Sequence, residues 1–493
     1  MHKIFRLSSL FKLWVCLVVA LCSAPSLARL VYLCESPDQG NKLVEHTEGS
    51  TACAPLNQSA LNTDPRLAHA SSGHIQPQLN IFEFHDAKIL RPLQAKWNTP
   101  DSRISIAHFG DSLLQNGYAI DSIRKTIATV KPSAGRGMIF PYAIARTYSQ
   151  YDYSSSYEGN WTSANSIQLF PKLALGLSGF AAHTNDPTSS FSFQFKTALD
   201  AGPKNLQIFL KVPSTGYQLI VGVDGLYKAI NLDPVFEQQS PSVKISVPQL
   251  SDNLRIEVIN TSAEPGTFEL HGLSIENSSS GVIYHNLGVG GAAFNSINSQ
   301  ALFARQLPSI APDVVVLDWG TNDIIYKNTV PANHAEVVLR TIEKVRASAP
   351  NAVIVLTSVQ DMNFRGKNIT AAKQYADLMR KLAFENDCLF YDWYRVSGGA
   401  NTMRSWVSDT LASKDNIHLN ERGYRIKGRA FGQALLQTLE FNRQYPQSNA
   451  LEIQLATSKS NKALAQIKRK TPPNTKPANT GNLKPNSKAP RKK

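Results

Sequence analysis

Apolar and polar positions predict an α/β arrangement over residues 280–445. Continuous apolar runs alternate there with segments of helical spacing, which is typical of parallel strands buried on both faces and covered by helices. The runs predicted as strands are 282–284, 312–319, 352–357 and 389–393, and the predicted helices are 295–307, 332–347, 371–386 and 421–441. This alternation predicts a doubly wound sheet with right-handed crossovers.

The same pattern occurs once earlier in the chain. Residues 104–108 have the pattern of a short buried strand, and residues 114–130 carry apolar residues at helical spacing. Ser112 therefore falls where a strand ends and a helix begins, with its hydroxyl facing the positive end of the helix dipole. That position suits a nucleophile, but it equally suits an ordinary helix N-cap. The local sequence leaves both interpretations open.

A different pattern separates these two α/β stretches. Short alternating runs, with turn residues about every ten positions, predict an all-β sandwich. The runs are 191–195, 206–210, 218–223, 243–247 and 254–259. Because they lie between two α/β stretches, we interpret 146–279 as a domain inserted into an α/β domain formed by 79–145 and 280–445.

The N-terminal residues predict export. Residues 1–28 combine three basic residues, an apolar core and a small-residue end at Ala28, which is typical of a secretory signal peptide, with a retained anchor as the alternative. Residues 29–78 form a short cysteine segment and a linker. In an oxidising compartment Cys34 and Cys53 are expected to pair, with two free thiols as the alternative. No later stretch is long enough to predict a transmembrane span.

The net charge of +14 suggests a nucleic-acid binder, but its distribution does not. Eleven basic residues and no acid lie from Lys459 to the end, and residues 1–28 hold three more, so the body between carries no net formal charge. A neutral body argues against a nucleic-acid groove. Residues 446–493 are expected to form a basic disordered tail, either simply solvated or attached to an anionic envelope polymer.

Four predicted loops at strand ends bring together polar groups suited to acyl transfer. Ser112 would attack a carbonyl carbon, His418 would take its proton, and Asp415 would hold the imidazole. The tetrahedral oxyanion needs donors, which the N–H of Ser112, an N–H of the 288–291 loop and the Asn322 amide would supply. Each residue alone has an ordinary structural explanation, as a turn, a cap or a surface histidine. Their order and shared position at strand ends favour catalysis.

These blocks resemble the GDSL, or SGNH, family of serine esterases. The matching segments are Gly110-Asp111-Ser112-Leu113, the loop 286–291, Gly320-Thr321-Asn322-Asp323 and Asp415-Asn416-Ile417-His418. The resemblance implies a three-layer α/β/α flavodoxin-like fold. It implies Ser112, Asp415 and His418 as catalytic residues, and Ser112, Gly291 and Asn322 as the oxyanion hole. Gly290 is the alternative to Gly291 as the backbone donor of the oxyanion hole. The resemblance implies no metal and no cofactor.

The inserted β domain makes the chain similar to bacterial peptidoglycan O-acetylesterases, whose insert resembles a carbohydrate-binding module. This implies an exported serine esterase, periplasmic or secreted, that acts on an acetylated glycan. The alternatives are an O-acetyltransferase with the same site and a non-catalytic glycan-binding protein. Four aromatic residues are expected either to stack on sugar rings or to pack in the interior: Tyr151, Tyr153, Tyr157 and Trp161.

Overall fold

The computed structural model describes residues 73–211, 215–232 and 241–444, together with the backbone of three short strands near the N-terminus. These strands are β1 (Cys16–Ala20), β2 (Leu30–Glu35) and β3 (Leu43–His46), which pair as an antiparallel sheet. They belong to a separate unit from residues 49–451. β1 falls within the predicted apolar core of the signal peptide, whereas the rest of that peptide, Cys53 and the basic tail lie outside the described residues.

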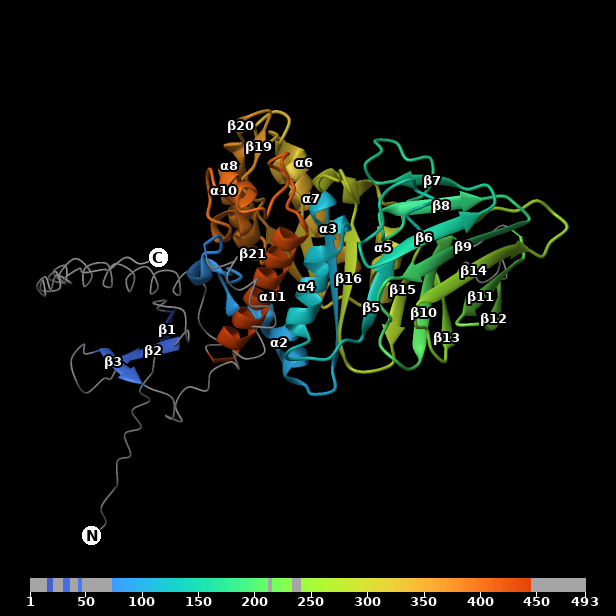
Figure 1. The fold of residues 1–493 in the computed structure, drawn as a ribbon, viewed down its shortest axis with the longest axis horizontal. Coiled ribbons are helices and arrows are strands. Elements are labelled where there is room, and N and C mark those ends of the chain that lie inside the picture. The colour runs from blue at the N-terminus through green and yellow to red at the C-terminus, as the bar shows by residue number, and fades with distance from the viewer. Residues whose placement is uncertain are drawn as a thin grey trace, which may run out of the picture. The chain divides into compact units, whose positions relative to one another are not determined.

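The α/β domain is built on one five-stranded parallel sheet (Figure 1). Its spatial order is β16-β4-β17-β18-β21, so the first strand in the chain lies second in the sheet, the arrangement of flavodoxin-like folds. The strands are β4 (Arg103–Gly110), β16 (Gly281–Gly288), β17 (Val314–Asp318), β18 (Val353–Thr357) and β21 (Leu389–Tyr391). Every residue of β17 and β18 is buried, which explains their continuous apolar sequences.

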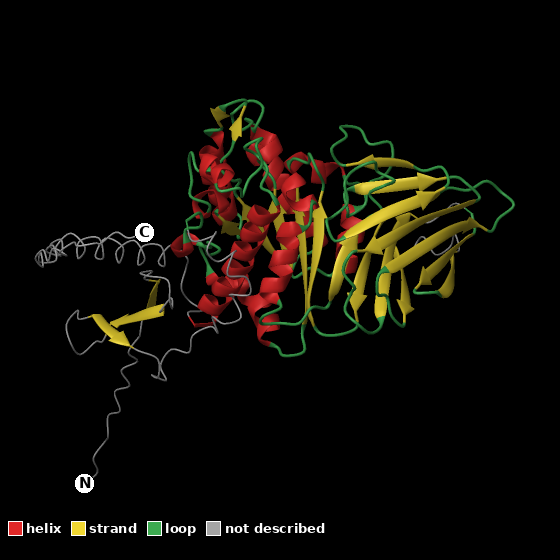
Figure 2. Cartoon of the chain, viewed as in Figure 1, coloured by secondary structure: helices red, strands yellow, loops and turns green. Residues whose placement is uncertain are grey.

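Two groups of helices complete the three layers (Figure 2). One group contains α2 (Arg91–Asn98), α4 (Tyr118–Ile127) and α11 (Glu421–Gln444), and α11 contacts both of the others. The other contains α5 (Phe303–Gln306), α7 (His334–Ser348) and α8 (Ala371–Glu385). The remaining short helices are α3 (Ser112–Gln115), α6 (Thr321–Ile324), α9 (Trp393–Val396) and α10 (Met403–Ser408). The predicted α/β/α fold class is therefore confirmed. No helix among the described residues combines the length and apolarity needed to cross a membrane.

Two predicted helices are interrupted. The segment 114–130 is divided into α3 and α4 at Gly117, whose φ of 85° is left-handed, and the side chain of Asn116 accepts a hydrogen bond from the N–H of Tyr118. The segment 295–307 forms 3₁₀ turns and one short helix: η5 (Phe294–Ser299), α5 and η6 (Leu307–Ile310). As a result, each of the two predicted helices is replaced by shorter helical segments.

The inserted region forms two antiparallel sheets. One has the order β13-β10-β15-β8-β7, with β5 also paired to β15, and the other has the order β12-β11-β14-β9-β6. Their strands are β5 (Gly135–Ile139), β6 (Tyr153–Glu158), β7 (Thr162–Asn165), β8 (Phe180–Thr184), β9 (Thr188–Phe195), β10 (Lys204–Lys211), β11 (Tyr217–Val223), β12 (Leu226–Leu232), β13 (Ser242–Val247), β14 (Asn253–Asn260) and β15 (Phe268–Asn277). The sandwich thus begins with β5, ahead of the predicted boundary at 146, because β5 pairs with β15.

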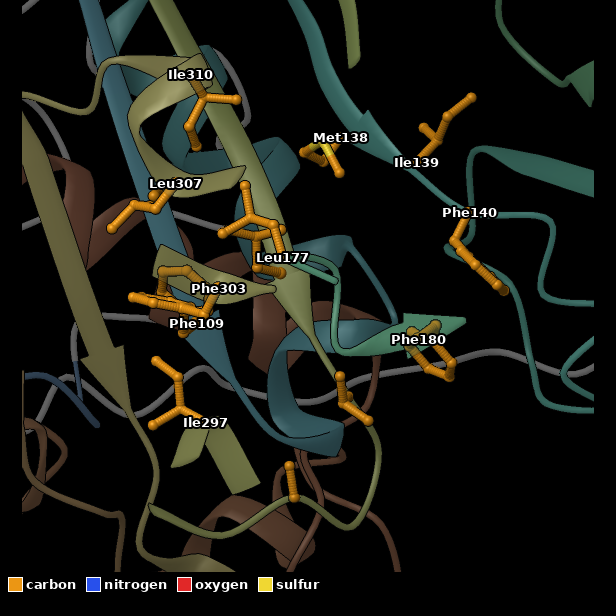
Figure 3. Close-up of a cluster of buried hydrophobic side chains, with 14 of the residues drawn as sticks. Phe109, Met138, Ile139, Phe140, Leu177, Phe180, Ile297, Phe303, Leu307 and Ile310 are labelled. Atoms are coloured by element: carbon orange, nitrogen blue, oxygen red, sulfur yellow. The ribbon is translucent and has the colours of Figure 1, made fainter. Parts of the chain in front are cut away.

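The sandwich and the parallel sheet share one hydrophobic core. Figure 3 shows Phe109 and Phe303 of the α/β domain in the same buried cluster as Leu177 and Phe180 of the insert. The rings of Phe109 and Phe303 lie 5.6 Å apart, centroid to centroid. β5 also contacts β16, the edge strand of the parallel sheet. The insert is therefore fastened beside the strand that leads into the glycine loop.

Candidate active site

Three neighbouring strand ends bring the predicted loops together. In the register of the sheet, Gly110 of β4 lies between Gly288 of β16 and Asp318 of β17. The loops that follow these strands therefore leave the same edge of the sheet, as in other open α/β folds. Ser112 is the first residue of α3, and the Asp111 side chain caps that helix by accepting a 2.8 Å hydrogen bond from the N–H of Leu113.

The structure brings Ser112, His418 and Asp415 into one hydrogen-bonded series. Ser112 Oγ lies 3.0 Å from His418 Nε2, and His418 Nδ1 lies 2.7 Å from Asp415 Oδ2. With the imidazole proton on Nδ1, the hydroxyl donates to Nε2 and the ring donates to the carboxylate. The arrangement is that of a serine nucleophile, a base and a group that orients the base.

The backbone holds Asp415 in its ionised form. Partial burial raises the pKa of the Asp415 carboxyl, but hydrogen bonds from the His418 ring and from the N–H groups of Ile417 and His418 outweigh this and keep the pKa below its usual range. Both N–H groups donate to Asp415 Oδ1, at 2.9 and 3.0 Å. Oδ2 is thereby left for the imidazole. The side chains of His418 and Asp415 are 40% and 44% exposed, so this site is open to solvent.

The N–H groups of Gly290 and Gly291 in the glycine loop differ in their hydrogen bonding. The N–H of Gly290 already donates to Oε1 of Gln115 on α3. The N–H of Gly291 has no hydrogen-bond partner among the described residues, and the same is true of the N–H of Ser112. Gly291 also has a φ of 84°, a conformation that favours glycine, and space around its Cα is open, with Ile167 3.6 Å from an added Cβ. Gly291 rather than Gly290 is thus free to donate to a ligand.

Asn322 and Asp323 hold the segment that follows Gly291. Asn322 Nδ2 donates a 2.9 Å hydrogen bond to the carbonyl oxygen of Ala292. The Asp323 carboxylate accepts from the N–H of Phe294, at 3.3 and 3.4 Å. An amide NH₂ has two donors, so Asn322 retains one N–H for a ligand.

A buried ionic group lies behind these loops. Asp318 accepts hydrogen bonds from Lys427 Nζ at 3.1 Å and from Thr357 Oγ1 at 2.6 Å, and His108 Nε2 lies 3.4 Å away. Burial would raise the pKa of Asp318, but the Lys427 charge and the His108 ring outweigh this and hold it well below its usual range. These contacts tie α11, which follows His418, to the end of β17.

Two of the four aromatic residues that were expected either to stack on sugars or to pack lie against the hydrophobic core. Tyr153 is 1% exposed, and its hydroxyl donates to the carbonyl oxygen of Phe140. Tyr151 stacks on Tyr118, with centroids 4.4 Å apart. Trp161 packs against the hydrophobic core, whereas Tyr157 is 38% exposed. The packing interpretation is therefore correct for Tyr153 and Trp161.

Sequence reasoning missed two residues that contact the glycine loop. Gln115 follows Ser112 by three positions on α3, and besides accepting from Gly290 it donates a 2.7 Å hydrogen bond to the carbonyl oxygen of Tyr148. A Cβ added to Gly290 would lie 2.9 Å from the Tyr148 hydroxyl. The available signal was the buried polar Gln115 on an otherwise apolar helix face, because such a group requires partners.

Comparisons with known proteins bear on the family and the fold of the chain. Residues 272–426 match the GDSL-like Lipase/Acylhydrolase family. A solved structure titled "Peptidoglycan O-acetylesterase in action, 5 min" is 20% identical, with a TM-score of 0.58, and the match covers 73% of this chain and 99% of that one. No match was found among curated proteins.

Two acetylxylan esterase structures match a smaller part of the chain. AlAXEase is 20% identical, with a TM-score of 0.27, over 31% of this chain and 81% of that one. Axe2 from Geobacillus stearothermophilus is 18% identical, also with a TM-score of 0.27, over 32% of this chain and 73% of that one.

The fold and the family match define the class of protein. Residues 272–426 match the GDSL-like hydrolase family, which confirms the resemblance drawn from the sequence motifs, and the solved structure shares the fold. The protein is a hydrolase that acts on ester bonds.

Proposed function

We propose that the protein is an exported serine esterase that removes O-acetyl groups from a cell-envelope polysaccharide, with peptidoglycan as the first candidate. The observation that carries the proposal is the continuous contact from Ser112 Oγ through His418 to Asp415. A serine hydroxyl is a weak nucleophile unless a base takes its proton, and this arrangement places that base within hydrogen-bond distance.

The reaction follows from these positions. Ser112 Oγ attacks the acetyl carbonyl carbon while His418 Nε2 accepts the hydroxyl proton. The N–H groups of Ser112 and Gly291 and the second N–H of Asn322 donate to the tetrahedral oxyanion. His418 returns its proton to the sugar oxygen as the C–O bond breaks. Water then attacks the acetyl-serine with His418 again as base, and His418 returns this proton to Ser112 Oγ as acetate leaves.

The open site supports a polymeric substrate. Because His418 and Asp415 are both partly exposed, an ester on the surface of a large glycan can reach Ser112 without entering a tunnel. The fold match to the peptidoglycan O-acetylesterase structure extends over 73% of this chain, a larger share than the hydrolase family match at 272–426 occupies. The basic, apolar and small-residue pattern of residues 1–28 supports export.

The first test is acetate release from O-acetylated peptidoglycan and from 4-nitrophenyl acetate, without an added sugar acceptor. We expect the wild type to cleave both and Ser112→Ala to cleave neither. Ser122→Ala, on the neighbouring helix α4, is the matched control and should retain full activity.

Three outcomes would contradict parts of the proposal. Retained activity in Ser112→Ala would exclude this nucleophile. Cleavage of 4-nitrophenyl acetate alone would exclude peptidoglycan and direct the search to other acetylated polysaccharides. Acetate release that requires a sugar acceptor would identify a transferase.

A further inference from the structure

Exposed apolar side chains gather beside the glycine loop. Among the described residues, nine large hydrophobic side chains are exposed, and four of them lie in two short segments near Gly290 and Gly291. These four are Tyr148, Ile167, Leu169 and Phe170, with exposed fractions of 47%, 51%, 77% and 84%. Scattered apolar side chains are normal on protein surfaces, whereas a cluster beside a site indicates binding.

Contacts fix this cluster next to the residues that face the proposed oxyanion. A Cβ added to Gly290 would lie 2.9 Å from the Tyr148 hydroxyl, and one added to Gly291 would lie 3.6 Å from Ile167. Leu169 and Phe170 follow Ile167 by only two and three residues. Tyr148 and Ile167 therefore lie beside the glycine loop, and Leu169 and Phe170 are exposed on the same loop as Ile167.

The base of the loop that carries three of these residues is anchored. It joins β7 to β8 (Figure 1), and the N–H of Ser166 donates a 2.9 Å hydrogen bond to the carbonyl oxygen of Gly179. The N–H of Gln168 donates to the carbonyl oxygen of Asn165, at 3.2 Å. Gly179 in turn packs on Val289 of the glycine loop, since an added Cβ would lie 2.6 Å from the Val289 side chain. The insert thus holds the loop in place, while its tip, Leu169 and Phe170, stays in solvent.

We propose that Tyr148, Ile167, Leu169 and Phe170 form a platform on which the sugar that carries the ester packs one face of its ring. This inference rests on the proposed function and names the part of that site that binds the alcohol side of the ester. Pyranose rings present C–H groups on their faces, and aromatic and aliphatic side chains offer a matching apolar surface.

An acetyl group is too small to occupy this platform. It has one methyl group beyond the carbonyl carbon, whereas the cluster consists of four large exposed side chains. With an exposed triad, the remaining part of the substrate must be held outside the hydrogen-bonded site. A sugar ring bonded to the ester oxygen is in the position to be held there.

The experiment compares two substrates in Phe170→Ala. On soluble O-acetylated peptidoglycan strands we expect kcat/KM to fall about tenfold, mainly through a higher KM, because one aromatic contact is lost. On 4-nitrophenyl acetate we expect activity within about twofold of wild type, because the chemistry at Ser112 is unchanged. Phe170→Tyr should retain the activity on the glycan, and Leu169→Ala combined with Phe170→Ala should lose more. Because both side chains are largely exposed, the folded state should be unaffected.

The matched control is Tyr227→Ala, which removes an aromatic side chain that is 73% exposed on β12, far from α3 in the view of Figure 1. The control should leave both activities unchanged.

An unchanged glycan KM in Phe170→Ala, with the wild type active on the glycan, would overturn the platform alone. Equal loss of activity on both substrates in Phe170→Ala would overturn the platform too. So would a Phe170→Ala variant that no longer binds anionic phospholipid vesicles but turns over the glycan as the wild type does. A wild type active on 4-nitrophenyl acetate but on no acetylated glycan would overturn the proposed function and the platform together.

Discussion

The Asn322 side chain donates a hydrogen bond of 2.9 Å to the carbonyl oxygen of Ala292, the residue directly after Gly291. This contact joins the loop after β17 to the loop after β16. Since Asp323 also accepts from the N–H of Phe294, the turn at Gly320–Asp323 holds the segment directly after the glycine loop at two points. Asn322 therefore has two roles in the proposed mechanism: it donates to the oxyanion and it supports the neighbouring donor.

Asn322→Ala should lower kcat by about 10² to 10³ while KM changes little, because the oxyanion exists only in the transition state. Steady-state kinetics on 4-nitrophenyl acetate measure both constants. Asn295→Ala, at an exposed asparagine of η5, is the control and should behave as wild type. Asn322→Asp should be at least as impaired as Asn322→Ala, because it replaces the amide donors with a negative charge. An active Asp variant would contradict the oxyanion role.

Gln115→Leu tests the support of the glycine loop from the opposite side. The substitution removes the bond from Gly290 and the 2.7 Å bond to Tyr148, while keeping a side chain of similar size. We expect kcat to fall about tenfold, because the lost hydrogen bond from the N–H of Gly290 is worth about 1 to 1.5 kcal/mol. Gln115→Glu keeps the acceptor for Gly290 and should lose less. A lower melting temperature with unchanged kcat would show that Gln115 serves stability only.

The alternation of strands and helices along the chain and the motif residues were predictable because both leave local signals. The buried parallel strand β17 appears in the sequence as a continuous apolar run, and alternating runs indicated β9 and β11. Ser112 and Asn322 directly follow such runs, so their position at one sheet edge followed from topology. The sequence alone could not choose between Gly290 and Gly291, since the choice depends on a hydrogen bond from Gln115.

Features that depend on distant contacts were not predictable. Gln115 and Gly290 are 175 residues apart, and no local pattern links them. The pairing of β5 with β15 likewise joins segments on opposite sides of the insert. The break at Gly117 was missed because a helical pattern of apolar residues continues through it, while its left-handed φ is a backbone property. Whether aromatic residues face solvent or core also required the structure.

Asp415→Asn should reduce kcat by about 10³ to 10⁴, because the amide no longer stabilises the imidazolium and can favour the wrong tautomer. In the wild type, hydrogen bonds keep the pKa of Asp415 below its usual range despite partial burial. This carboxylate therefore stays ionised between pH 5 and 8, and the variant should be impaired by a similar factor across that interval. The pH dependence of kcat/KM for both proteins checks this. Convergence of the two profiles at high pH would contradict the orienting role.

The carboxyl of Asp111 should make stability depend on pH. It is 1% exposed, and its Oδ2 has no hydrogen-bond partner among the described residues. Burial raises the pKa of Asp111, and the Asp318 charge makes a smaller contribution in the same direction. The N–H of Leu113 and the Lys427 charge lower the pKa, but they do not offset burial, and the result is a pKa of about 7. The unfolded chain has the ordinary value of 3.8. Between these values the folded protein keeps a proton that the unfolded chain releases, so the unfolding free energy falls as pH rises.

Asp111→Asn removes this pH dependence while keeping an acceptor for the N–H of Leu113. At pH 4 both folded proteins are uncharged at this position, and because pH 4 is close to the unfolded pKa of 3.8, their unfolding free energies should be similar. Above pH 7 the variant should be more stable, by up to about 4 kcal/mol for a pKa difference of this size. Urea unfolding of both proteins from pH 4 to 8 measures the difference. A difference that stays constant over this range would mean that Asp111 is ionised throughout, and that burial next to Ser112 does not hold its proton.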